Sequence, residues 1–414
     1  MLTCGIDFGT SNSTVAVAED GHARLLRVEG DHRTIPSAVF WEADGPPLFG
    51  RAGIEAYVEG VEGRLMRGLK STLGSALVGE RTQVGAKAIS FRDVIARFFT
   101  HLKAQLDAAS PITPPVTLGR PVHFVDGDAS ADRAAQDTLE GIAKAVGFRQ
   151  IAFQLEPIAA ALHYEQTTTR EELVLIVDIG GGTSDFSIVR VGPGRMLRAD
   201  RNDDVLATDG VRVGGTDLDR LLSLAAVMPH LGYNSTTGSG RGTMPRHYYL
   251  DLATWHRINT LYTQRIAADL KALRAVADAP EKLDRLIRVI AARQGHGVAM
   301  AVEAAKIALS DADAARLHLG PLTGGGNPVV TRATFEGAIA MPLSRIAATL
   351  TETLQQAQLS PHDLSTVFLT GGSAGLPALH ALVAQLLPGI PVATGDMLGS
   401  VGTGLALDAA ARFA

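Results

Sequence analysis

"GIDFGTSNSTVAV" occupies residues 5–17 and consists of an apolar run that ends at Asp7, a glycine-containing polar turn and a second apolar run. The same pattern returns in "VDIGGGTSDFSIV" at residues 177–189, where Asp178 takes the place of Asp7. Two apolar runs joined by a glycine turn are typical of a β-hairpin. The sequence therefore predicts two similar hairpins that lie far apart in the chain.

These two copies are too widely spaced for a solenoid repeat, so they indicate a duplicated lobe. Segments with helical periodicity follow each strand-rich copy, at residues 131–146 and 377–387. We therefore expect an α/β protein of two lobes, with one glycine turn on each side of a cleft.

A sharp glycine turn exposes successive backbone N–H groups, which together can bind an anion. The hydroxyls of Thr10, Ser11 and Ser13 would add donors, so the turn suits a phosphate group. For one copy, an ordinary hairpin is the simpler interpretation, because Asp, Gly, Thr and Ser are common turn residues. Two copies favour a phosphate site, with a divalent cation held by Asp7 and Asp178 through its waters.

A third glycine turn follows another apolar run in residues 366–383, where Gly371, Gly372 and Ser373 precede a helix that opens at Pro377. A backbone without side chains allows a flat ligand to approach closely. Many α/β proteins contain such a strand, turn and helix, so this motif supports a ligand site only together with the other two turns.

Length and composition limit the class of protein. The chain has 414 residues, of which 46% are apolar, enough for a large core in two domains. The net charge of −5 gives no indication of a nucleic-acid or membrane-surface partner. Cys4 is the single cysteine and lies in an apolar run, which predicts a buried residue. No leader or membrane-spanning run is visible in the sequence, so we expect a cytoplasmic protein.

Other catalytic signatures are absent from the sequence. Residues 63–71 read GRLMRGLKS and approach a P-loop, but Leu69 separates Gly68 from Lys70. The sequence contains no HExxH and no pair of CxxC motifs, so zinc chemistry is not predicted.

Two segments are expected to be insertions into the lobes. Residues 31–118 carry breakers and short helical pieces, without the strong strand pattern of their flanks. A second insertion begins after Gly214 and Gly215 and includes a Gly, Ser and Thr cluster at 234–243, which predicts a mobile loop. Residues 252–310 predict helices with one apolar face.

Seven motifs together resemble the ATPase domain of DnaK-type heat-shock chaperones, and the chain is most similar to the stand-alone YegD-like group of that family. The motifs, in chain order, are GIDFGTSNS (5–13), EGDHRTIPS (29–37), EPIAAAL (156–162), VDIGGGTSDFS (177–187), VLATDGVRVGGTDLD (205–219), EAAKIALS (303–310) and LTGGSAGLP (369–377). The resemblance implies the two-lobed actin-like ATPase fold of the actin and sugar-kinase superfamily, with duplicated ribonuclease-H-like lobes and inserted subdomains.

The resemblance also implies roles for single residues. Asp7 and Asp178 match the carboxylates that hold Mg²⁺ through water, and Lys70 matches the lysine that positions the attacking water. Glu156 and Asp185 match acids near that water. The expected catalytic residues are Lys70, Glu156, Asp185 and Thr183. The expected nucleotide-binding residues are Gly9, Thr10, Ser11, Gly180, Gly181, Gly182, Thr183, Gly214, Gly215, Glu303, Lys306, Ser310, Gly371, Gly372 and Ser373.

Simpler interpretations exist for two of these assignments. Lys70 could be a solvated surface lysine. Glu303 and Lys306 could form a surface ion pair, although together with Ser310 they lie on one helix face that matches the family's adenosine-binding face. The family's adenine-stacking arginine is replaced by Gly375.

The resemblance further implies how the chain is divided. The expected regions are the lobe I core at 1–39 and 117–167, its insertion at 40–116, the lobe II core at 168–213 and 329–414, and a helical insertion at 214–328. DnaK-type chaperones continue past the position of Ala414 with a peptide-binding domain, which we do not expect in this chain.

We therefore expect an ATPase that binds ATP or ADP with Mg²⁺ between its lobes and hydrolyses ATP slowly. A chaperone or co-chaperone role through nucleotide-gated lobe closure would follow, with protein clients or co-chaperones as partners. One alternative is a nucleotide-gated binding or reactivating module whose turnover is incidental. Two others are a small-molecule kinase and an actin-like filament on the same fold.

Overall fold

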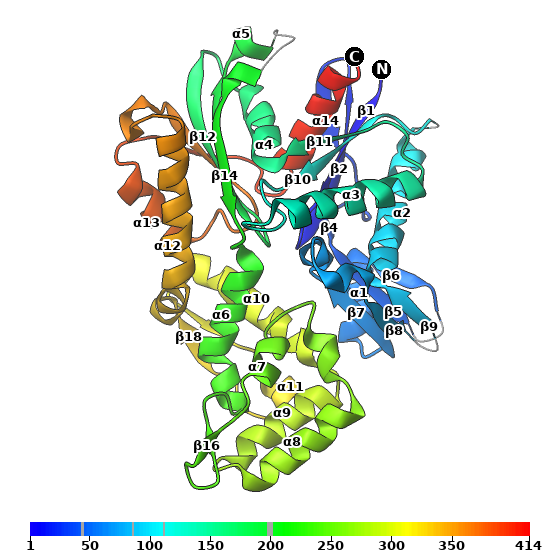
Figure 1. Cartoon of the computed structure of the whole chain (residues 1–414), viewed down its shortest axis with the longest axis vertical. Coiled ribbons are helices and arrows are strands. Elements are labelled where there is room, and N and C mark those ends of the chain that lie inside the picture. Colours follow the sequence, from blue (N-terminus) through cyan, green and yellow to red (C-terminus); the bar gives the residue numbers. More distant parts are fainter. Residues whose placement is uncertain (43–44, 85–86, 111, 197–201) are drawn as a thin grey trace. The chain divides into compact units, whose positions relative to one another are not determined.

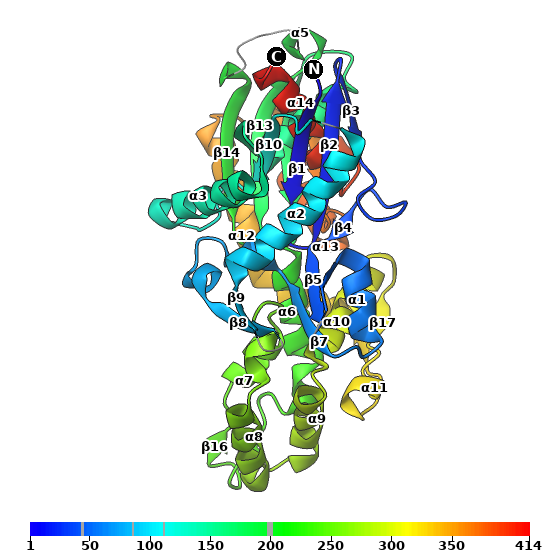
Figure 2. The same ribbon diagram turned by 90° about the vertical axis from the view of Figure 1, so that its right-hand side faces the viewer.

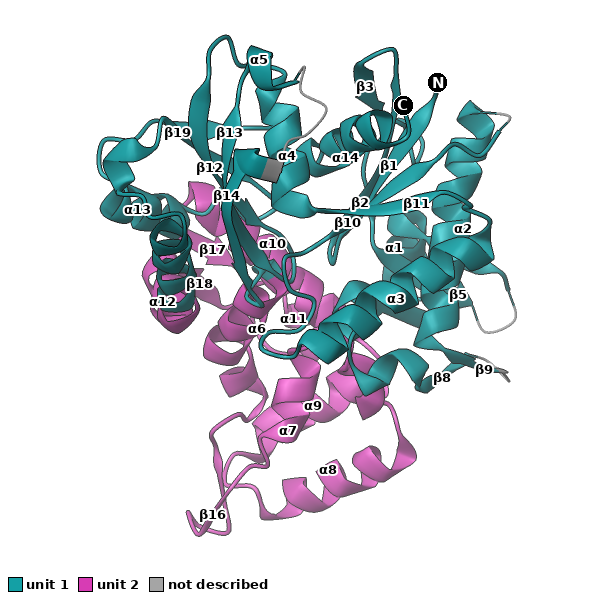
Figure 3. Cartoon of the chain, turned by 45° about the horizontal axis from the view of Figure 1, so that its top comes forward, with its two compact units in different colours: residues 1–215, 344–414 teal, residues 216–343 magenta. Residues whose placement is uncertain are grey.

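The computed structural model describes residues 1–42, 45–84, 87–110, 112–196 and 202–414. These residues form two compact units, which Figure 3 shows in different colours. The larger unit combines Met1–Gly215 with Ser344–Ala414, and the smaller one is the continuous segment Thr216–Leu343. The lobe boundaries given above stay a prediction, and the smaller unit ends later than the helical insertion expected at 214–328.

The first β-sheet of the larger unit has the strand order β11-β10-β1-β2-β3, and the short β4 pairs with β2. Within it, β1 runs antiparallel to β2 and parallel to β10 (Figure 1). The strands are β1 (Thr3–Phe8), β2 (Asn12–Glu19), β3 (His22–Leu25), β4 (Ile35–Pro36), β10 (Val116–Arg120) and β11 (Ile151–Leu155). Cys4 is fully buried in β1, as its apolar surroundings predict.

The second sheet repeats this arrangement in the order β14-β13-β12-β19-β20. Here β12 runs antiparallel to β13 and parallel to β19. The strands are β12 (Glu172–Ile179), β13 (Ser184–Val191), β14 (Val205–Val211), β19 (Thr366–Thr370) and β20 (Val392–Thr394). Order and direction therefore agree strand by strand, so the duplication seen in two short motifs extends to whole sheets.

Each sheet is covered on one face by the helix that follows the other sheet. α4 (Glu156–Glu165) follows β11 of the first sheet and packs against β12 and β13 of the second. α14 (Ser400–Arg412) follows β20 of the second sheet and packs against β1, β2 and β10 of the first. The two helices also contact each other (Figure 1), and a Cβ on Gly404 would overlap the carbonyl oxygen of Ala159. This exchange of helices joins the two sheets.

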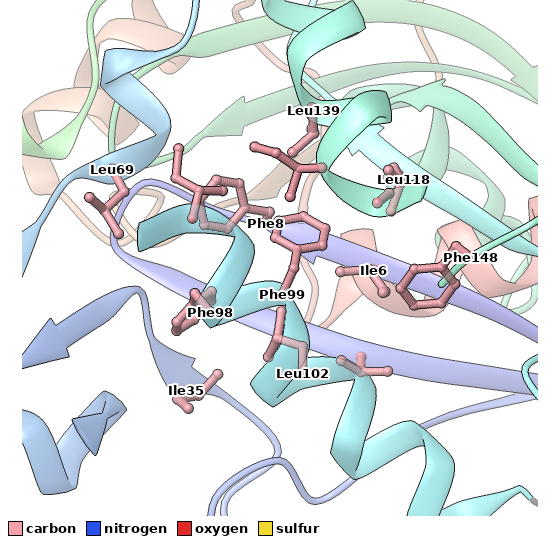
Figure 4. Close-up of a cluster of buried hydrophobic side chains, with 14 of the residues drawn as sticks. Ile6, Phe8, Ile35, Leu69, Phe98, Phe99, Leu102, Leu118, Leu139 and Phe148 are labelled. Carbon is pink, nitrogen blue, oxygen red and sulfur yellow. The ribbon is translucent and has the colours of Figure 1, made fainter. Parts of the chain in front are cut away.

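The opposite face of the first sheet is covered by α2 (Phe91–Ala109), which Figure 2 shows in front of the strands. Phe8 of β1 packs between Phe98 and Phe99 of α2, with ring centroids 5.8 and 5.2 Å apart. Figure 4 shows these rings among other buried apolar side chains. Such pairs of aromatic rings bury a large apolar area, which anchors the helix on the strand that carries Asp7.

The helices predicted after the two sheet motifs are present. α3 spans Ala129–Val146 and packs against α2. Asp128 caps α3 by accepting hydrogen bonds from the backbone N–H groups of Ser130 and Ala131, which explains why the helix begins before residue 131. α13 spans Pro377–Leu386. The larger unit also contains the short α5 (Pro193–Met196).

Residues 31–118 contain more strand than the sequence predicted. β5 lies between β6 and β7 in a small antiparallel sheet, and β8 pairs with β9 in a hairpin. The elements are β5 (Ala38–Glu42), β6 (Pro47–Phe49), α1 (Gly50–Val58), β7 (Gly63–Arg67), β8 (Arg81–Val84) and β9 (Lys87–Ser90). These strands are short and follow glycines and prolines closely, so their alternation does not stand out.

The smaller unit is mostly helical, as the apolar spacing over 252–310 predicts. Its helices are α6 (Gly215–Ala226, from the last residue of the larger unit), α7 (His247–Leu252), α8 (Gln264–Val276), α9 (Pro280–Ala291), α10 (Gly295–Asp311), α11 (Gly320–Thr323) and the first part of α12 (Arg332–Gln356). β17 (Ala314–Arg316) pairs with β18 (Val329–Thr331). None of the helices in the described ranges is long and apolar enough to cross a membrane.

The cluster at 234–243, which its composition predicts to be a mobile loop, contains a small hairpin. β15 (Thr236–Thr237) pairs with β16 (Gly242–Thr243). The Asp278 carboxylate accepts hydrogen bonds from the Thr236 hydroxyl and from the backbone N–H groups of Ser239 and Gly240. The order of this segment thus depends on a residue distant in sequence, which local composition cannot reveal.

Candidate active site

The glycine turns of the two sheets lie against each other. A Cβ added to Gly181 would overlap the Ser11 hydroxyl and would lie 3.1 Å from the Cβ of Thr10. A Cβ added to Gly182 would lie 2.7 Å from the Thr10 hydroxyl. Glycine is required for so close an approach. The structure thus brings together the two turns that the sequence singled out.

Both hairpins have the same register. Asp7 is paired with Thr14 across the first hairpin, and Asp178 is paired with Asp185 across the second. Asp7 and Asp178 are therefore equivalent residues near the ends of β1 and β12. Asp185 has the uncharged Thr14 as its counterpart, so the second hairpin contributes one more carboxylate to the site.

Backbone hydrogen bonds hold the second turn in place. Within the turn, Gly180 N–H donates to the carbonyl oxygen of Thr183 at 2.9 Å, and Gly215 N–H donates to the carbonyl oxygen of Gly180, also at 2.9 Å. A Cβ added to Gly214 would lie 2.5 Å from the nitrogen of Gly182. The pair Gly214 and Gly215 thus packs directly on the second turn.

Ser37 holds the first turn, a role that we did not predict for it. Its hydroxyl donates to the carbonyl oxygen of Gly9 at 2.6 Å, and its backbone N–H donates to the carbonyl oxygen of Ser11 at 2.9 Å. Ser37 is the last residue of the motif EGDHRTIPS, so that motif was the signal that could have revealed it.

The third turn adjoins the second one. Gly371 has φ of +88°, and a Cβ there would lie 2.5 Å from the Asp178 carboxylate. Ser373 is buried, and its backbone N–H donates to the carbonyl oxygen of Ile179 at 3.0 Å. Gly372 is exposed beside it. The left-handed backbone at Gly371 therefore allows the third turn to approach the strand end that carries Asp178.

Lys70 is buried and forms an ion pair, so it is not the solvated surface lysine of the simpler interpretation. It lies on a short 3₁₀ helix, Leu69–Thr72, that begins after Gly68 with φ of 69°. The Lys70 Nζ lies 2.5 Å from Oε1 of Glu156, the first residue of α4. Both side chains are less than a tenth exposed. Since an unpaired buried charge is costly, each of the two charges stabilises the other.

Three aspartates interact electrostatically with this ion pair, and the pKa of each is raised. Burial and the charge of Glu156 raise the pKa of Asp7 to about 7, although Lys70 opposes the shift. Burial and Glu156 also raise the pKa of Asp185 to about 7, against hydrogen bonds from Thr183 and the Val122 N–H. Burial, then Glu156, Asp185 and Asp7, raise the pKa of Asp178 well above its ordinary value. These pKa shifts arise first because the carboxyl groups are buried, and then because several acidic groups share a small volume.

This excess of carboxylates fits a divalent cation held through water. No group of three or more His, Cys, Asp or Glu side chains in the described part of the chain is arranged to hold a metal directly. Asp7 and Asp178 could instead bind waters of Mg²⁺, which dehydrates reluctantly and keeps several waters in proteins. Four carboxylates accompany Lys70, so a cation would compensate negative charge that the lysine leaves unbalanced.

Glu303, Lys306 and Ser310 share α10 in the smaller unit, as their spacing predicts. Lys306 is buried, and its Nζ lies 2.8 Å from Oδ1 of Asp219 on α6. Lys306 therefore forms a buried ion pair with a residue of a second helix. Asp219 was not predicted, although it ends the motif VLATDGVRVGGTDLD.

Comparison with known proteins agrees with this geometry. Two equivalent sheets, exchanged helices and facing glycine turns define a duplicated two-lobed protein with a candidate phosphate site. Residues 3–98, 131–228 and 291–411 match the family described as Hsp70 protein. The chain therefore belongs to the Hsp70 family, and its fold is the two-lobed actin-like ATPase fold of that family. The predicted fold class and family are thus confirmed.

Individual relatives are chaperones of the DnaK type. The chain is 27% identical to the chaperone protein dnaK of Cyanophora paradoxa, over 94% of this chain and 56% of that protein. It is 26% identical to the chaperone protein DnaK of Thermus thermophilus, over 92% of this chain and 56% of that protein. The chain thus spans little more than half the length of these relatives.

Proposed function

We propose that the protein binds ATP with Mg²⁺ and hydrolyses it slowly to ADP and phosphate. The observation that carries the proposal is the contact between the two glycine turns, beside which Asp7, Asp178 and the Lys70–Glu156 pair are gathered. Members of the Hsp70 family are ATPases that bind ATP and ADP, which supports the same activity for this chain.

Each group would contribute by binding or orientation. The N–H groups and hydroxyls of the turns at 9–11 and 180–183 would bind phosphate oxygens, and the turn at 371–373 would border the nucleoside. Asp7 and Asp178 would hold Mg²⁺ through its waters. When bound, Mg²⁺ would neutralise phosphate charge during the transfer of the terminal phosphoryl group to water.

Lys70 would orient the attacking water, and Glu156 would keep the Lys70 ammonium in place. Asp185 would accept a proton from the water, because burial and Glu156 raise its pKa to about 7. The Val122 N–H donates to Asp185 at 2.7 Å, and Thr183 also hydrogen-bonds to it, so its carboxylate is held in position. Glu303, Lys306 and Ser310 would contact the adenosine, as the resemblance implies.

A chaperone or co-chaperone role would follow if nucleotide exchange changes the relation of the lobes. The alternative is a binding or reactivating module whose turnover is incidental. Such a nucleotide-gated module should capture protein partners differently in its ATP-bound and ADP-bound forms, and a pull-down with each form measures that difference. A small-molecule kinase is disfavoured if phosphate release needs no acceptor, and a filament is disfavoured if ATP does not cause sedimentation.

Asp178→Asn tests the activity directly. The variant removes a buried charge that Glu156, Asp185 and Asp7 repel, so we expect an unchanged or higher melting temperature. ATP hydrolysis should fall by about a hundredfold or more, because the cation loses one of two carboxylates. Phosphate release with and without Mg²⁺ measures the rate. Asp107→Asn, on the exposed end of α2, is the matched control and should hydrolyse ATP as the unmodified chain does.

Two results would contradict the proposal. The first is full hydrolysis by the Asp178→Asn variant. The second is the absence of any heat of binding when the unmodified chain is titrated with ATP and ADP in the presence of Mg²⁺.

A further inference from the structure

A third hydroxyl, that of Ser71, faces the second glycine turn. Ser71 follows Lys70 on the 3₁₀ helix Leu69–Thr72, and its Oγ would lie 3.6 Å from a Cβ added to Gly182. The Thr10 hydroxyl approaches the same glycine from the first turn, at 2.7 Å from that Cβ position. Ser71 therefore belongs to the small set of hydroxyls that surround the turn proposed to bind phosphate.

The hydroxyls of Thr72 and Ser75, in the same segment, have structural partners, whereas that of Ser71 has none among the described residues. Thr72 Oγ1 donates to the carbonyl oxygen of Leu69, and Ser75 Oγ donates to the carbonyl oxygen of Thr72, each at 2.7 Å. Within the described chain, the Ser71 hydroxyl makes no hydrogen bond. Its donor is thus available to a ligand, in contrast to the hydroxyls that stabilise the same segment.

The position of Ser71 is fixed by its surroundings. Its backbone N–H donates to the carbonyl oxygen of Gly68 at 3.1 Å, while the side chains of Leu69 and Thr72 on either side are fully buried. Lys70 is fixed by Glu156. A donor on a rigid, buried turn loses little entropy on binding, which favours a strong hydrogen bond to a charged oxygen.

We infer that Ser71 donates its hydroxyl proton to an oxygen of the terminal phosphate of bound ATP. The inference rests on the proposed function, in which Lys70, the preceding residue, orients water at that phosphate. ADP lacks the terminal phosphate, so Ser71 would contribute to the preference for ATP over ADP.

Ser71→Ala in the full chain tests this role. With Mg²⁺ present, the affinity for a non-hydrolysable ATP analogue should fall by about tenfold, as for loss of one hydrogen bond to a charged group. The affinity for ADP should change by less than about twofold, because no contact with ADP is lost. Ser71→Thr keeps the hydroxyl and should restore the preference for the ATP analogue. Isothermal titration of the chain with the ATP analogue and with ADP measures the ratio of the two affinities.

Ser75→Ala is the control for a purely structural effect. It removes a hydroxyl that supports the same segment through Thr72 and should leave the ratio of the two affinities unchanged. If Ser71→Ala lowers the affinities for both nucleotides equally, or changes neither affinity, the inference is overturned while the proposed function stands. If the unmodified chain binds neither nucleotide, both proposals fail together.

Discussion

Lys70, of the buried Lys70–Glu156 ion pair, interacts with several carboxylates of the site. The charges of Glu156, Asp7 and Asp185 all raise the pKa of Lys70, against the opposing effect of burial, which comes first in size. Lys70 therefore retains other carboxylates as partners when Glu156 is neutralised. Glu156 has no second lysine among these neighbours. The two ends of the ion pair are thus unequal in their surroundings.

Because the two residues have unequal surroundings, we expect substitution of Lys70 and substitution of Glu156 to lower the free energy of unfolding by different amounts. Lys70→Met leaves several buried carboxylates without a cation and should lower the free energy of unfolding by about 3–5 kcal/mol, the usual cost of breaking a buried pair. Glu156→Gln should cost less, because the Lys70 ammonium still attracts Asp7 and Asp185. Urea denaturation without nucleotide measures both variants. Equal losses, or a larger loss for Glu156→Gln, would show that the aspartates do not support Lys70.

At the scale of helices and strands, the crossing of α14 with α4 depends on one glycine. A Cβ on Gly404 would overlap the Ala159 carbonyl oxygen, so Gly404→Ala must displace α14 from α4. We expect a loss of about 3 kcal/mol or more in the free energy of unfolding, since backbone cannot yield as a side chain does. Gly337→Ala is the matched control within α12, where a Cβ would meet nothing within 4 Å.

The control substitution should stabilise the protein by about 0.5–1 kcal/mol, through the higher helix propensity of alanine. Thermal unfolding of the two variants compares a glycine needed for packing with one that is not. A tolerated alanine at Gly404 would mean that the two helices are not in backbone contact.

The first turn of α3 is tied to the loop after β10 by Asp132. Arg120 and the Phe124 N–H both donate to this carboxylate at 2.6 Å. Burial raises the pKa of Asp132, but the hydrogen bonds from Arg120, Phe124 and Val125 outweigh it and hold the pKa below its ordinary value. Since the pKa is lower in the folded state, the carboxylate stabilises the fold above its unfolded pKa. This contribution is lost as the pH falls through the folded pKa.

Asp132→Asn should therefore destabilise the protein at about pH 7 and have progressively less effect below about pH 4. Denaturation curves at a series of pH values measure the difference from the unmodified chain. Asp137→Asn, on an exposed position of the same helix, should show no such pH dependence. A constant difference between Asp132→Asn and the unmodified chain at all pH values would show that the hydrogen bonds do not require the charge.

Across the whole molecule, the features predicted correctly from the sequence are those that a short stretch of residues determines. The turns at Gly9 and Gly180 were visible because glycine, aspartate and hydroxyl residues leave a short pattern in each copy. Lys70 and Glu156 leave no such pattern, and only the family resemblance pointed to them. Ser37 and Asp219 were missed because their partners lie far away in the chain.

The duplicated fold is also asymmetric in charge. Asp185 and Glu156 occupy positions whose counterparts are Thr14 and Ser400, at the second strand of each hairpin and the first residue of each exchanged helix. A repeat search therefore finds the two turns but cannot find these acids. The larger unit thus repeats one architecture, but Asp185 and Glu156 each have an uncharged counterpart in the other half.

The exchange of α4 and α14 has a consequence for biosynthesis. The ribosome produces the strands of the first sheet early, but the helix that covers one face of them begins only at Ser400. Until α14 is translated, β1 and β2 would expose to solvent the face that α14 later buries. The nascent N-terminal half would therefore remain open to aggregation or to a holding factor until α14 has been translated.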